Sequence, residues 1–445
     1  MKLLFISLGC DKNLVDSEEM LGILTDNGIE ITDDEQEADV IVVNTCCFIH
    51  DAKEESIQNI LDMARYRTEG NCRALIVTGC LAQRYKEEIR QEIPEVDAVL
   101  GTTSYDEIMT AINTALQGET FEDYRDINFL PKVKNKRVIT TGGHYSYLKI
   151  AEGCDKHCTY CIIPKIRGDF RSVPMEDLLE QAAYLVSQGV SELTLVAQET
   201  TVYGTDLYGE KKLHELLTKL CQIEDLHWIR VQYCYPEEIY DELLEVIAKE
   251  DKICKYLDLP IQHASSGILK KMGRRMDQEK LIDIIANIRE KVPKIVLRTT
   301  LISGFPGETQ QDHEILKQFV EETQFDRLGV FTYSPEEGTP AANMDNQIDE
   351  EVKLDRQAEI MEIQQDISFE KGEQRVGESL EVFIEGKVAD EAAYVGRTYA
   401  DAPGVDGYIF VQTGRELMSG DFVQVRVTGA LEYDLIGELE DEFTE

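Results

Sequence analysis

Residues 152–161 read Glu152-Gly-Cys-Asp-Lys-His-Cys-Thr-Tyr-Cys161, which places three cysteines in one short polar loop. Cys154, Cys158 and Cys161 have the spacing Cys-x3-Cys-x2-Cys. Three thiolates on one loop can ligate three irons of a 4Fe-4S cube, because thiolate is the preferred ligand of such clusters. The fourth iron then has no protein ligand and can chelate the amine and carboxylate of a small molecule. The loop therefore predicts a catalytic cluster with one open iron.

Two other interpretations of this loop stay open. A structural zinc ion needs four ligands, and His157 is a conceivable fourth. Its position directly before Cys158 strains simultaneous coordination, so the spacing favours a cluster over zinc. Ordinary packing of three cysteines is favoured least, because the loop is so polar.

The loop lies near the start of a long segment in which strand-like and helix-like patterns alternate, from Tyr147 to about residue 335. The strand candidates are residues 193–197, 228–232, 256–259, 296–302 and 327–332, and the helix candidates include 175–188, 211–222 and 278–291. About six such units predict a full or partial (TIM-like) β/α barrel, whose active site lies at the carboxyl ends of the strands.

Residues 1–118 show the same alternation. Short apolar runs at 3–8, 39–43 and 74–78 are separated by amphipathic stretches such as 16–27 and 52–65. This pattern predicts a doubly wound α/β domain, in which functional groups gather beyond the carboxyl ends of parallel strands. Cys10, Cys46 and Cys80 each follow one of the strand candidates by a few residues. The three thiols can therefore converge on one metal or cluster site.

The pattern changes towards the C-terminus. A long amphipathic helix is expected over about residues 349–371, and short alternating strands at 379–384, 408–411 and 422–428 follow it. Strands of this kind with glycine turns predict a small all-β barrel of the OB-like class. Residues from about 119 to 140 are expected to form a linker. The predicted organisation is an α/β multidomain chain with units at residues 1–118, 140–372 and 373–445.

Composition narrows the classes of function. The chain has 445 residues, 11 cysteines and a net charge of −41. Such an acidic surface repels nucleic-acid phosphates and favours a basic partner, although a local basic patch is conceivable at Lys132, Lys134, Lys136 and Arg137. An odd number of cysteines without a signal peptide or a membrane-length apolar stretch predicts a cytosolic, metal-binding protein.

Some polar and sulfur-containing side chains have simpler expected roles. Cys221, Cys234 and Cys254 fit packing as small apolar residues. Asp16 and Glu18 are expected at the positive start of the first helix. His263 either contacts substrate or cofactor or caps the helix that follows it.

The cysteine loop, with Tyr160 before its last cysteine, resembles the signature of the radical S-adenosylmethionine (radical SAM) superfamily. The resemblance implies that S-adenosylmethionine binds the open iron and is cleaved to methionine and a 5′-deoxyadenosyl radical, with Tyr160 close to it. The segment Thr300-Leu-Ile-Ser-Gly-Phe-Pro-Gly-Glu308 resembles the glycine segment near the cofactor, which makes Gly304 a candidate contact. Gln198 and Arg298 are further candidates, expected at strand ends that face the site.

Over nearly its whole length the chain resembles the methylthiotransferases, radical SAM enzymes that replace an unactivated C–H with C–SCH3. The opening Leu8-Gly-Cys-Asp-Lys-Asn-Leu-Val-Asp-Ser-Glu18 resembles the opening motif of that family. The resemblance implies that Cys10, Cys46 and Cys80 ligate a second 4Fe-4S cluster, which handles the sulfur, and that the C-terminal barrel is a TRAM domain. Cys47 follows Cys46, and chemistry alone leaves the ligand open; the Asn-Thr-Cys match favours Cys46. A flavodoxin or ferredoxin is the implied electron donor.

Two branches of the family compete as the nearest resemblance. One modifies adenosine in tRNA, and the other modifies the β-carbon of an aspartate in small-subunit ribosomal protein twelve. The opening motif and Asp258-Leu-Pro-Ile-Gln-His-Ala-Ser-Ser266 resemble the second branch. Residues 373–445 contain 17 acidic and 5 basic residues, a net charge of −12, which suits a basic ribosomal protein, free or on the subunit, better than tRNA.

The acidity also fits a role in solubility alone. Three alternatives to that function remain. A tRNA methylthiotransferase would carry out the same chemistry on RNA. A non-catalytic iron–sulfur protein would hold clusters for redox sensing or binding. A cluster-free zinc protein is the third.

Overall fold

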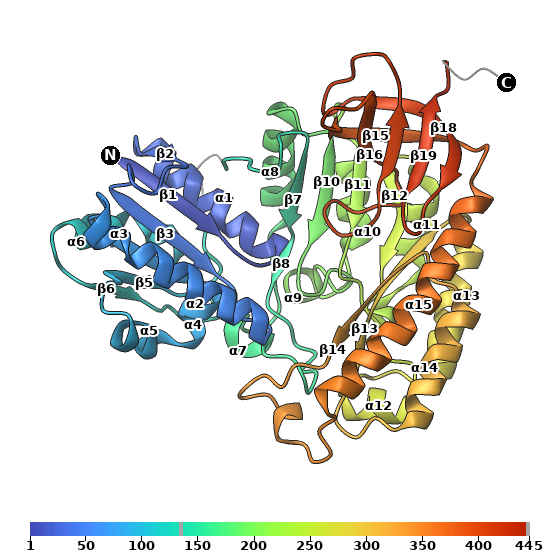
Figure 1. Ribbon diagram of the computed structural model, residues 1–445, viewed down its shortest axis with the longest axis horizontal. Helices are drawn as coiled ribbons and strands as arrows, with labels where there is room; N and C mark the ends of the chain where they lie inside the picture. Colours follow the sequence, from blue (N-terminus) through green and yellow to red (C-terminus); the bar gives the residue numbers. More distant parts are fainter. Residues whose placement is uncertain (133–136, 442–445) are drawn as a thin grey trace.

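The computed structural model describes residues 1–132 and 137–441, which form two parallel sheets with helices and one small barrel (Figure 1). The N-terminal sheet has the strand order β2-β1-β3-β4-β5-β6, and every neighbouring pair is parallel. Its strands are β1 (Lys2–Ser7), β2 (Glu30–Thr32), β3 (Val40–Thr45), β4 (Ala74–Gly79), β5 (Ala98–Leu100) and β6 (Phe121–Asp123).

Helices cover both faces of this sheet. As a result β3 and β4 are buried at every position, which suits their mostly apolar sequences. The helices are α1 (Asp11–Asp26), α2 (His50–Ala64), α3 (Tyr66–Glu69), α4 (Cys80–Arg84), α5 (Lys86–Glu92) and α6 (Ile108–Leu116), with a 3-10 turn at Tyr105–Glu107. The predicted doubly wound domain is confirmed.

The stretch expected to be a linker contributes to the fold. Strand β6 lies past residue 118 and pairs with β5 in parallel register, so the sheet extends into this stretch. Arg137 is buried and pairs with Glu18 at 2.8 Å, which removes it from the predicted basic patch. Lys134 and Lys136 of that patch lie outside the described residues.

The central sheet has the order β14-β13-β12-β11-β10-β7, again with all pairs parallel. Its strands are β7 (Tyr145–Lys149), β10 (Glu192–Val196), β11 (Trp228–Val231), β12 (Ile253–Asp258), β13 (Val296–Ser303) and β14 (Arg327–Thr332). Because β14 and β7 are not neighbours, the sheet is an open partial barrel, one of the two forms predicted.

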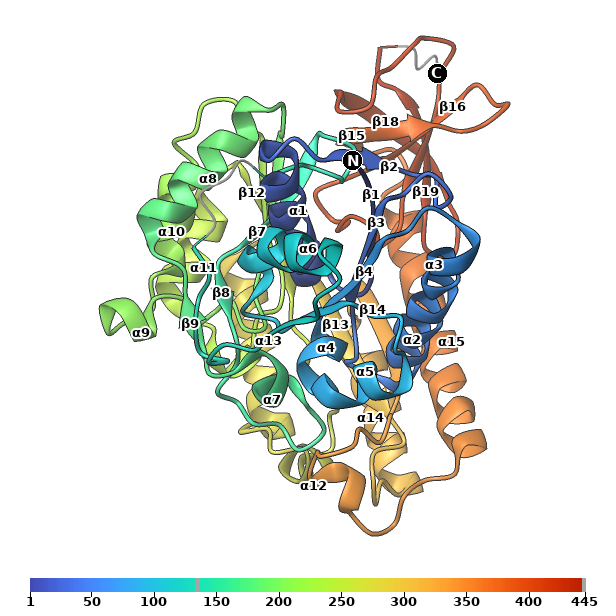
Figure 2. The ribbon, with the colours of Figure 1, turned by 90° about the vertical axis from the view of Figure 1, so that its left-hand side faces the viewer.

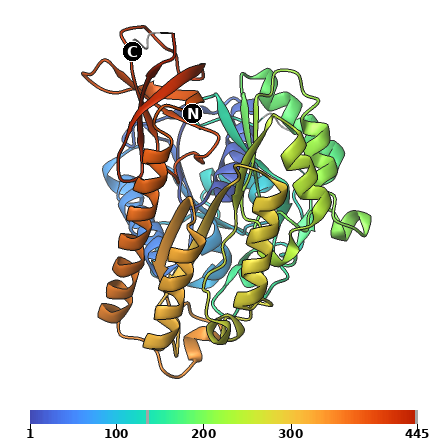
Figure 3. The same cartoon turned by 90° about the vertical axis from the view of Figure 1, so that its right-hand side faces the viewer.

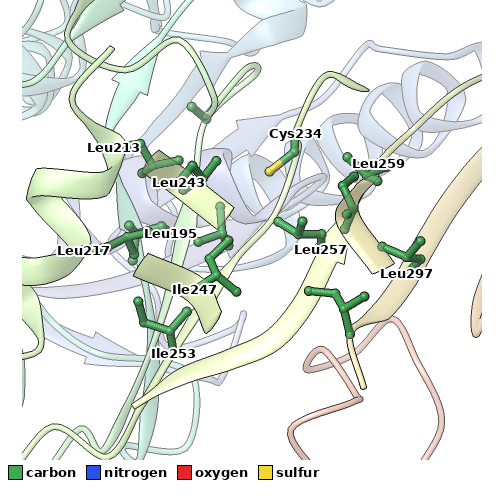
Figure 4. Close-up of a cluster of buried hydrophobic side chains, with 14 of the residues drawn as sticks. Leu195, Leu213, Leu217, Cys234, Leu243, Ile247, Ile253, Leu257, Leu259 and Leu297 are labelled. Atoms are coloured by element: carbon green, nitrogen blue, oxygen red, sulfur yellow. The ribbon is translucent and has the colours of Figure 1, made fainter. Parts of the chain in front are cut away.

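Helices follow these strands and close the core from outside. They are α8 (Met175–Ser187), α10 (Leu213–Leu220), α11 (Asp241–Lys249), α13 (Gln278–Lys291) and α14 (Gln310–Thr323). Figure 4 shows the leucines between the layers, with Leu195 and Leu257 from the strands facing Leu217 and Leu243 from the helices. Shorter elements are β8 (Ala151–Glu152), β9 (Arg171–Ser172), α7 (Ile163–Arg167), α9 (Thr205–Tyr208), α12 (Ser266–Lys271) and 3-10 turns at Pro236–Glu238 and Ala341–Asn343.

Helix α15 (Glu350–Gln374) runs along β14 and leads into the C-terminal barrel (Figure 3). The barrel is closed by five strands in the order β15-β16-β17-β19-β18, which confirms the predicted small all-β barrel. Their bounds are β15 (Ser379–Lys387), β16 (Ala393–Arg397), β17 (Ile409–Gln412), β18 (Phe422–Ala430) and β19 (Leu435–Leu439).

The three parts contact one another at defined edges. The C-terminal barrel packs on the amino ends of the central strands, where Trp228 and Val296 share a buried cluster with Phe383. The N-terminal domain contacts the central domain at the edge strand of its sheet, where α1 lies beside β7 (Figures 1 and 2). The carboxyl ends of the central strands are therefore surrounded by the loops that follow them. Among the described residues, no helix has both the length and the apolar character that a membrane span requires.

Candidate functional site

The loop that carries Cys154, Cys158 and Cys161 runs from β8 to α7, just beyond the carboxyl end of β7. Cys154 and Cys158 are buried, and Cys161 is half-buried. Gly153 has a φ of +81°, and a Cβ there would lie 2.6 Å from a backbone carbonyl, so only glycine fits this turn.

The thiols of this loop lie close enough to influence one another. Burial raises the pKa of Cys161 to about 12, and the thiols of Cys158 and Cys154 contribute to the increase. Burial likewise raises the pKa of Cys154 to about 11, with a contribution from Cys158. Tyr235 approaches the trio, with its Oη 3.7 Å from the Sγ of Cys158. The Tyr160 ring lies edge-on to Phe305, with ring centroids 6.5 Å apart.

Cys10, Cys46 and Cys80 lie at the carboxyl edge of the N-terminal sheet. Cys10 precedes α1 after β1, Cys46 follows β3, and Cys80 begins α4 after β4. These three strands are adjacent, so their ends bring the cysteines to one edge. Two glycines allow the approach: a Cβ on Gly9 would lie 2.9 Å from the Sγ of Cys46, and one on Gly79 would lie 2.6 Å from a backbone oxygen.

The thiols of the neighbouring residues Cys46 and Cys47 have different surroundings. Burial raises the pKa of Cys46, and the Cys10 thiol adds to this increase. Burial raises the pKa of Cys47 to about 12, but its charged neighbours are Arg84 and Glu336. The Cys46 Sγ lies 2.9 Å from where a Cβ on Gly9 would stand, so this thiol faces the Cys10 loop, whereas both Cys46 and Cys47 raise the pKa of Cys80.

Each trio offers three thiols, the donor type that iron–sulfur clusters use. Throughout the described ranges, no group of three or more His, Cys, Asp or Glu side chains is arranged to hold one metal ion. Three thiols on each side, buried or half-buried apart from Cys10, are the donor set that a 4Fe-4S cube requires.

The other candidate contacts have protein partners. Gln198 follows β10, where its Oε1 accepts from the Gly153 N–H at 2.9 Å and its Nε2 donates to Glu152 at 2.6 Å. Gln198 therefore holds the start of the cysteine loop. Gly304 follows β13 with a φ of +72°, and the Lys353 side chain lies against its α-carbon.

Arg298 lies elsewhere than expected. It is the third residue of β13, near the amino end of the strand rather than the carboxyl end. Its Nη1 donates to Asp258 at 2.9 Å, and its Nε donates to Asp406 of the C-terminal barrel at 3.2 Å. The strand continues past Arg298 as far as Ser303, and the guanidinium serves the contact between domains.

A buried charge network joins the two domains beside the trios, and sequence reasoning missed it. Asp16 lies in the second turn of α1, because the helix begins at Asp11 and not near Asp16 as expected. Lys149 pairs with Asp16 and, at 2.9 Å, with Glu152. Arg167 pairs with the same two carboxylates, at 2.7 and 3.2 Å. The visible signal was a lysine inside an apolar strand just before the cysteine loop.

The network fixes the charge of its members. Burial alone would raise the pKa of Glu152, but the Lys149 ammonium and the Arg167 guanidinium hold that pKa well below its usual range. Glu18, also expected at the helix start, instead accepts from the Thr140 N–H at 2.7 Å. His263 is buried, and its Nδ1 accepts from the N–H groups of the two residues that follow, so it caps the local turn.

Comparison with known proteins places the chain in a family. Three family models match it: the uncharacterized protein family UPF0004 over residues 2–101, the radical SAM superfamily over residues 148–320 and the TRAM domain over residues 376–439. The chain is 65% identical over 440 residues to the ribosomal protein uS12 methylthiotransferase RimO of Lachnoclostridium phytofermentans, covering 99% of this chain and 100% of the relative. The chain belongs to the RimO family. RimO of Acetivibrio thermocellus is 52% identical, with 98% of each chain covered.

Solved structures share the fold with this RimO family member. The radical S-adenosylmethionine methyltransferase TsrM from Kitasatospora setae, solved with cobalamin and a [4Fe-4S] cluster, aligns with a TM-score of 0.55 at 12% identity, covering 76% of this chain and 73% of TsrM. The cobalamin-dependent radical enzyme OxsB aligns with a TM-score of 0.50 at 13% identity, covering 81% of this chain and 56% of OxsB. At these identities the likeness shows the fold alone.

Proposed function

We propose that this chain transfers a methylthio group to the β-carbon of an aspartate in small-subunit ribosomal protein twelve (uS12). The observation that carries the proposal is the 65% identity, over the full length of both chains, to a RimO that is named as a uS12 methylthiotransferase. The match includes all three regions, so the proposal does not depend on one shared domain.

The residues of the two trios would hold the cofactors. Cys154, Cys158 and Cys161 would hold one 4Fe-4S cluster with an iron left open for S-adenosylmethionine, and Cys10, Cys46 and Cys80 would hold the second. When bound, the clusters and S-adenosylmethionine supply hydrogen-atom abstraction from the substrate carbon and donation of the methylthio sulfur. Tyr160 and Gly304 are proposed beside S-adenosylmethionine; Gln198 and Arg298 would act through the loop and the domain contact that they hold.

The chain's own part is to orient these groups and keep water away. Gln198 ties the start of the cysteine loop to β10, and the Lys149 and Arg167 pairs tie the same loop to α1. The Lys149 and Arg167 pairs are buried and the Gln198 bonds are partly buried, so side chains with little freedom to move hold the loop against α1. A radical centre needs such fixed geometry, because a small displacement exposes it to side reactions.

The proposed partners follow from charge. The acidic C-terminal unit, with a net charge of −12 over residues 373–445, favours a basic ribosomal protein, free or on the subunit. A flavodoxin or ferredoxin is the proposed electron donor, and the cytoplasm is the proposed compartment. The domain limits 1–118, 140–372 and 373–445 stay predictions.

One experiment tests the function. The chain is reconstituted anaerobically with iron and sulfide, reduced with S-adenosylmethionine, and incubated separately with uS12 and with tRNA. We expect mass spectrometry to show one added methylthio group on a uS12 aspartate. We also expect about eight irons per chain, as two 4Fe-4S clusters require.

Matched controls separate the alternatives. The variant C154A/C158A/C161A is expected to keep about four irons but to produce no methylthiolation. A methylthio group found on tRNA and not on uS12 would show the tRNA branch to be correct. A chain that binds iron but never cleaves S-adenosylmethionine would instead be a non-catalytic iron–sulfur protein.

A further inference from the structure

Arg167 makes direct contact with one of the six cysteines of the trios. It ends α7, the helix that follows the Cys161 loop, yet its Nη2 lies 3.4 Å from the Sγ of Cys80 at the start of α4. Helices α7 and α4 pack against each other. The segment after one trio therefore supplies a donor to a cysteine of the other trio.

Every other contact of this guanidinium holds it in place. Its Nη1 donates to Asp16 and Glu152 at 2.7 and 3.2 Å, and its Nη2 also donates to the Oδ1 of Asn13 at 2.9 Å. The side chain is 2% exposed. With so many donors engaged, the N–H group aimed at Cys80 has little freedom to turn elsewhere.

Arg167 faces two carboxylates and the Cys80 thiol. Lys149 and Arg167 face Asp16 and Glu152, so two cations balance two carboxylates. A cysteine that ligates iron is a thiolate, and an N–H donated from a cation to an anion is stronger than a neutral hydrogen bond. Cys80 as a ligand would therefore receive a charge-assisted hydrogen bond.

The second trio has a different donor. Cys158 is approached by the neutral phenol of Tyr235, at 3.7 Å. Hydrogen bonds to the sulfurs and nearby charge both set the reduction potential of an iron–sulfur cluster. A cationic donor favours the reduced, more negative cluster more strongly than a phenol does, because it offsets the added electron.

We propose that Arg167 is a positioning residue that donates a charge-assisted hydrogen bond to the Cys80 ligand and thereby raises the reduction potential of the cluster held by Cys10, Cys46 and Cys80. This inference rests on the proposed function only in requiring that the N-terminal trio binds a cluster. The same side chain keeps the N-terminal trio fixed relative to the cysteine loop that precedes α7.

The test measures the N-terminal cluster by itself. The full-length variant C154A/C158A/C161A serves as the background, so that its remaining cluster can be titrated anaerobically by electron paramagnetic resonance. Adding R167Q is expected to shift the midpoint potential to lower values, and to shift the Fe–S(Cys) stretching bands in resonance Raman to higher frequency. R167K keeps the charge and is expected to give a smaller shift in the same direction.

The matched control is K149Q, which removes the same charge from the same two carboxylates but touches no thiol. We expect its midpoint potential to stay near that of the background. An unchanged potential in R167Q, or an equal shift in K149Q, would overturn the role of Arg167 alone. If R167Q binds no cluster, R167K decides: a lowered potential supports the inference and an unchanged one refutes it. A background without any cluster would overturn this inference together with the two-cluster function.

Discussion

Glu192 and Arg397 form an ion pair at 2.8 Å, although 205 residues separate them in the sequence, and neither side chain is exposed. Glu192 begins β10 of the central sheet, and Arg397 ends β16 of the C-terminal barrel. Arg230 of β11 completes the group with a 2.9 Å bond to the other carboxylate oxygen. The barrel is thus held to the sheet by buried charges that depend on one another.

Replacing Glu192 by glutamine should weaken this contact strongly. The change removes the carboxylate that two buried guanidinium groups share and leaves Arg397 with Glu385 alone and Arg230 without its anion, which costs about 3–5 kcal/mol in comparable cases. Trp228 is the only tryptophan and lies in the same contact, so its fluorescence during urea unfolding reports on the contact directly. The control E37Q alters an exposed pair with Lys2 and should change stability by less than about 0.5 kcal/mol. Equal effects of the two variants would contradict the prediction.

Acid should remove the contribution of Glu192. Burial alone would raise the pKa of this carboxyl, but Arg397 and Arg230 outweigh burial and hold its pKa below the usual value of 4.5. The stabilisation is therefore complete above the unfolded-state pKa and is lost as the pH falls through the lower folded-state pKa. We expect the stability difference between the natural chain and E192Q to narrow below pH 4.5, as measured by Trp228 fluorescence. A difference that widens in acid would be inconsistent with this pairing.

The two adjacent cysteines should behave differently. C46A removes the thiol that faces Cys10 and is expected to lose about four irons per reconstituted chain. C47A removes a thiol beside Arg84 and is expected to keep its iron. Iron and sulfide analysis after anaerobic reconstitution distinguishes the two. Iron loss in C47A with full iron in C46A would assign the ligand to Cys47.

Gly79 should tolerate no side chain. Its φ is +91°, and an added Cβ would lie 2.6 Å from the Thr45 carbonyl oxygen, so G79A combines backbone strain with a collision beside Cys80. Gly28 has a φ of +75° and open space around it, so G28A tests strain alone, worth about 1 kcal/mol. We expect G79A to lower the thermal midpoint more than G28A and to reduce the iron bound by the N-terminal trio. Similar results for both variants would mean that the collision is relieved.

The sequence predicted the regular elements and the cysteine positions well for a physical reason. Helix α13 and strand β14 have the bounds expected, because long amphipathic and apolar patterns are local properties of the chain. The meeting of Cys10, Cys46 and Cys80 was predictable because parallel strands place their carboxyl ends at one edge. Short elements such as β2 and β16 were missed, since three to five residues carry little periodicity.

Contacts between domains could not be predicted in the same way. Asp16 and Arg298 were assigned to a helix start and a strand end, whereas they pair with Arg167 and Asp406 across domain boundaries. Such pairs depend on how complete domains dock, and no local pattern encodes that arrangement. The charges within apolar strands, Lys149 and Arg230, were the available hint.

The N-terminal sheet has a consequence for how the chain is made. All six of its strands lie between Lys2 and Asp123, before any strand of the central sheet. During synthesis this domain leaves the ribosome first, and domains generally fold as units in that order. Cys10, Cys46 and Cys80 can therefore come together before Arg167 has been added to the chain. The surroundings of the first trio are completed only by residues that are translated later.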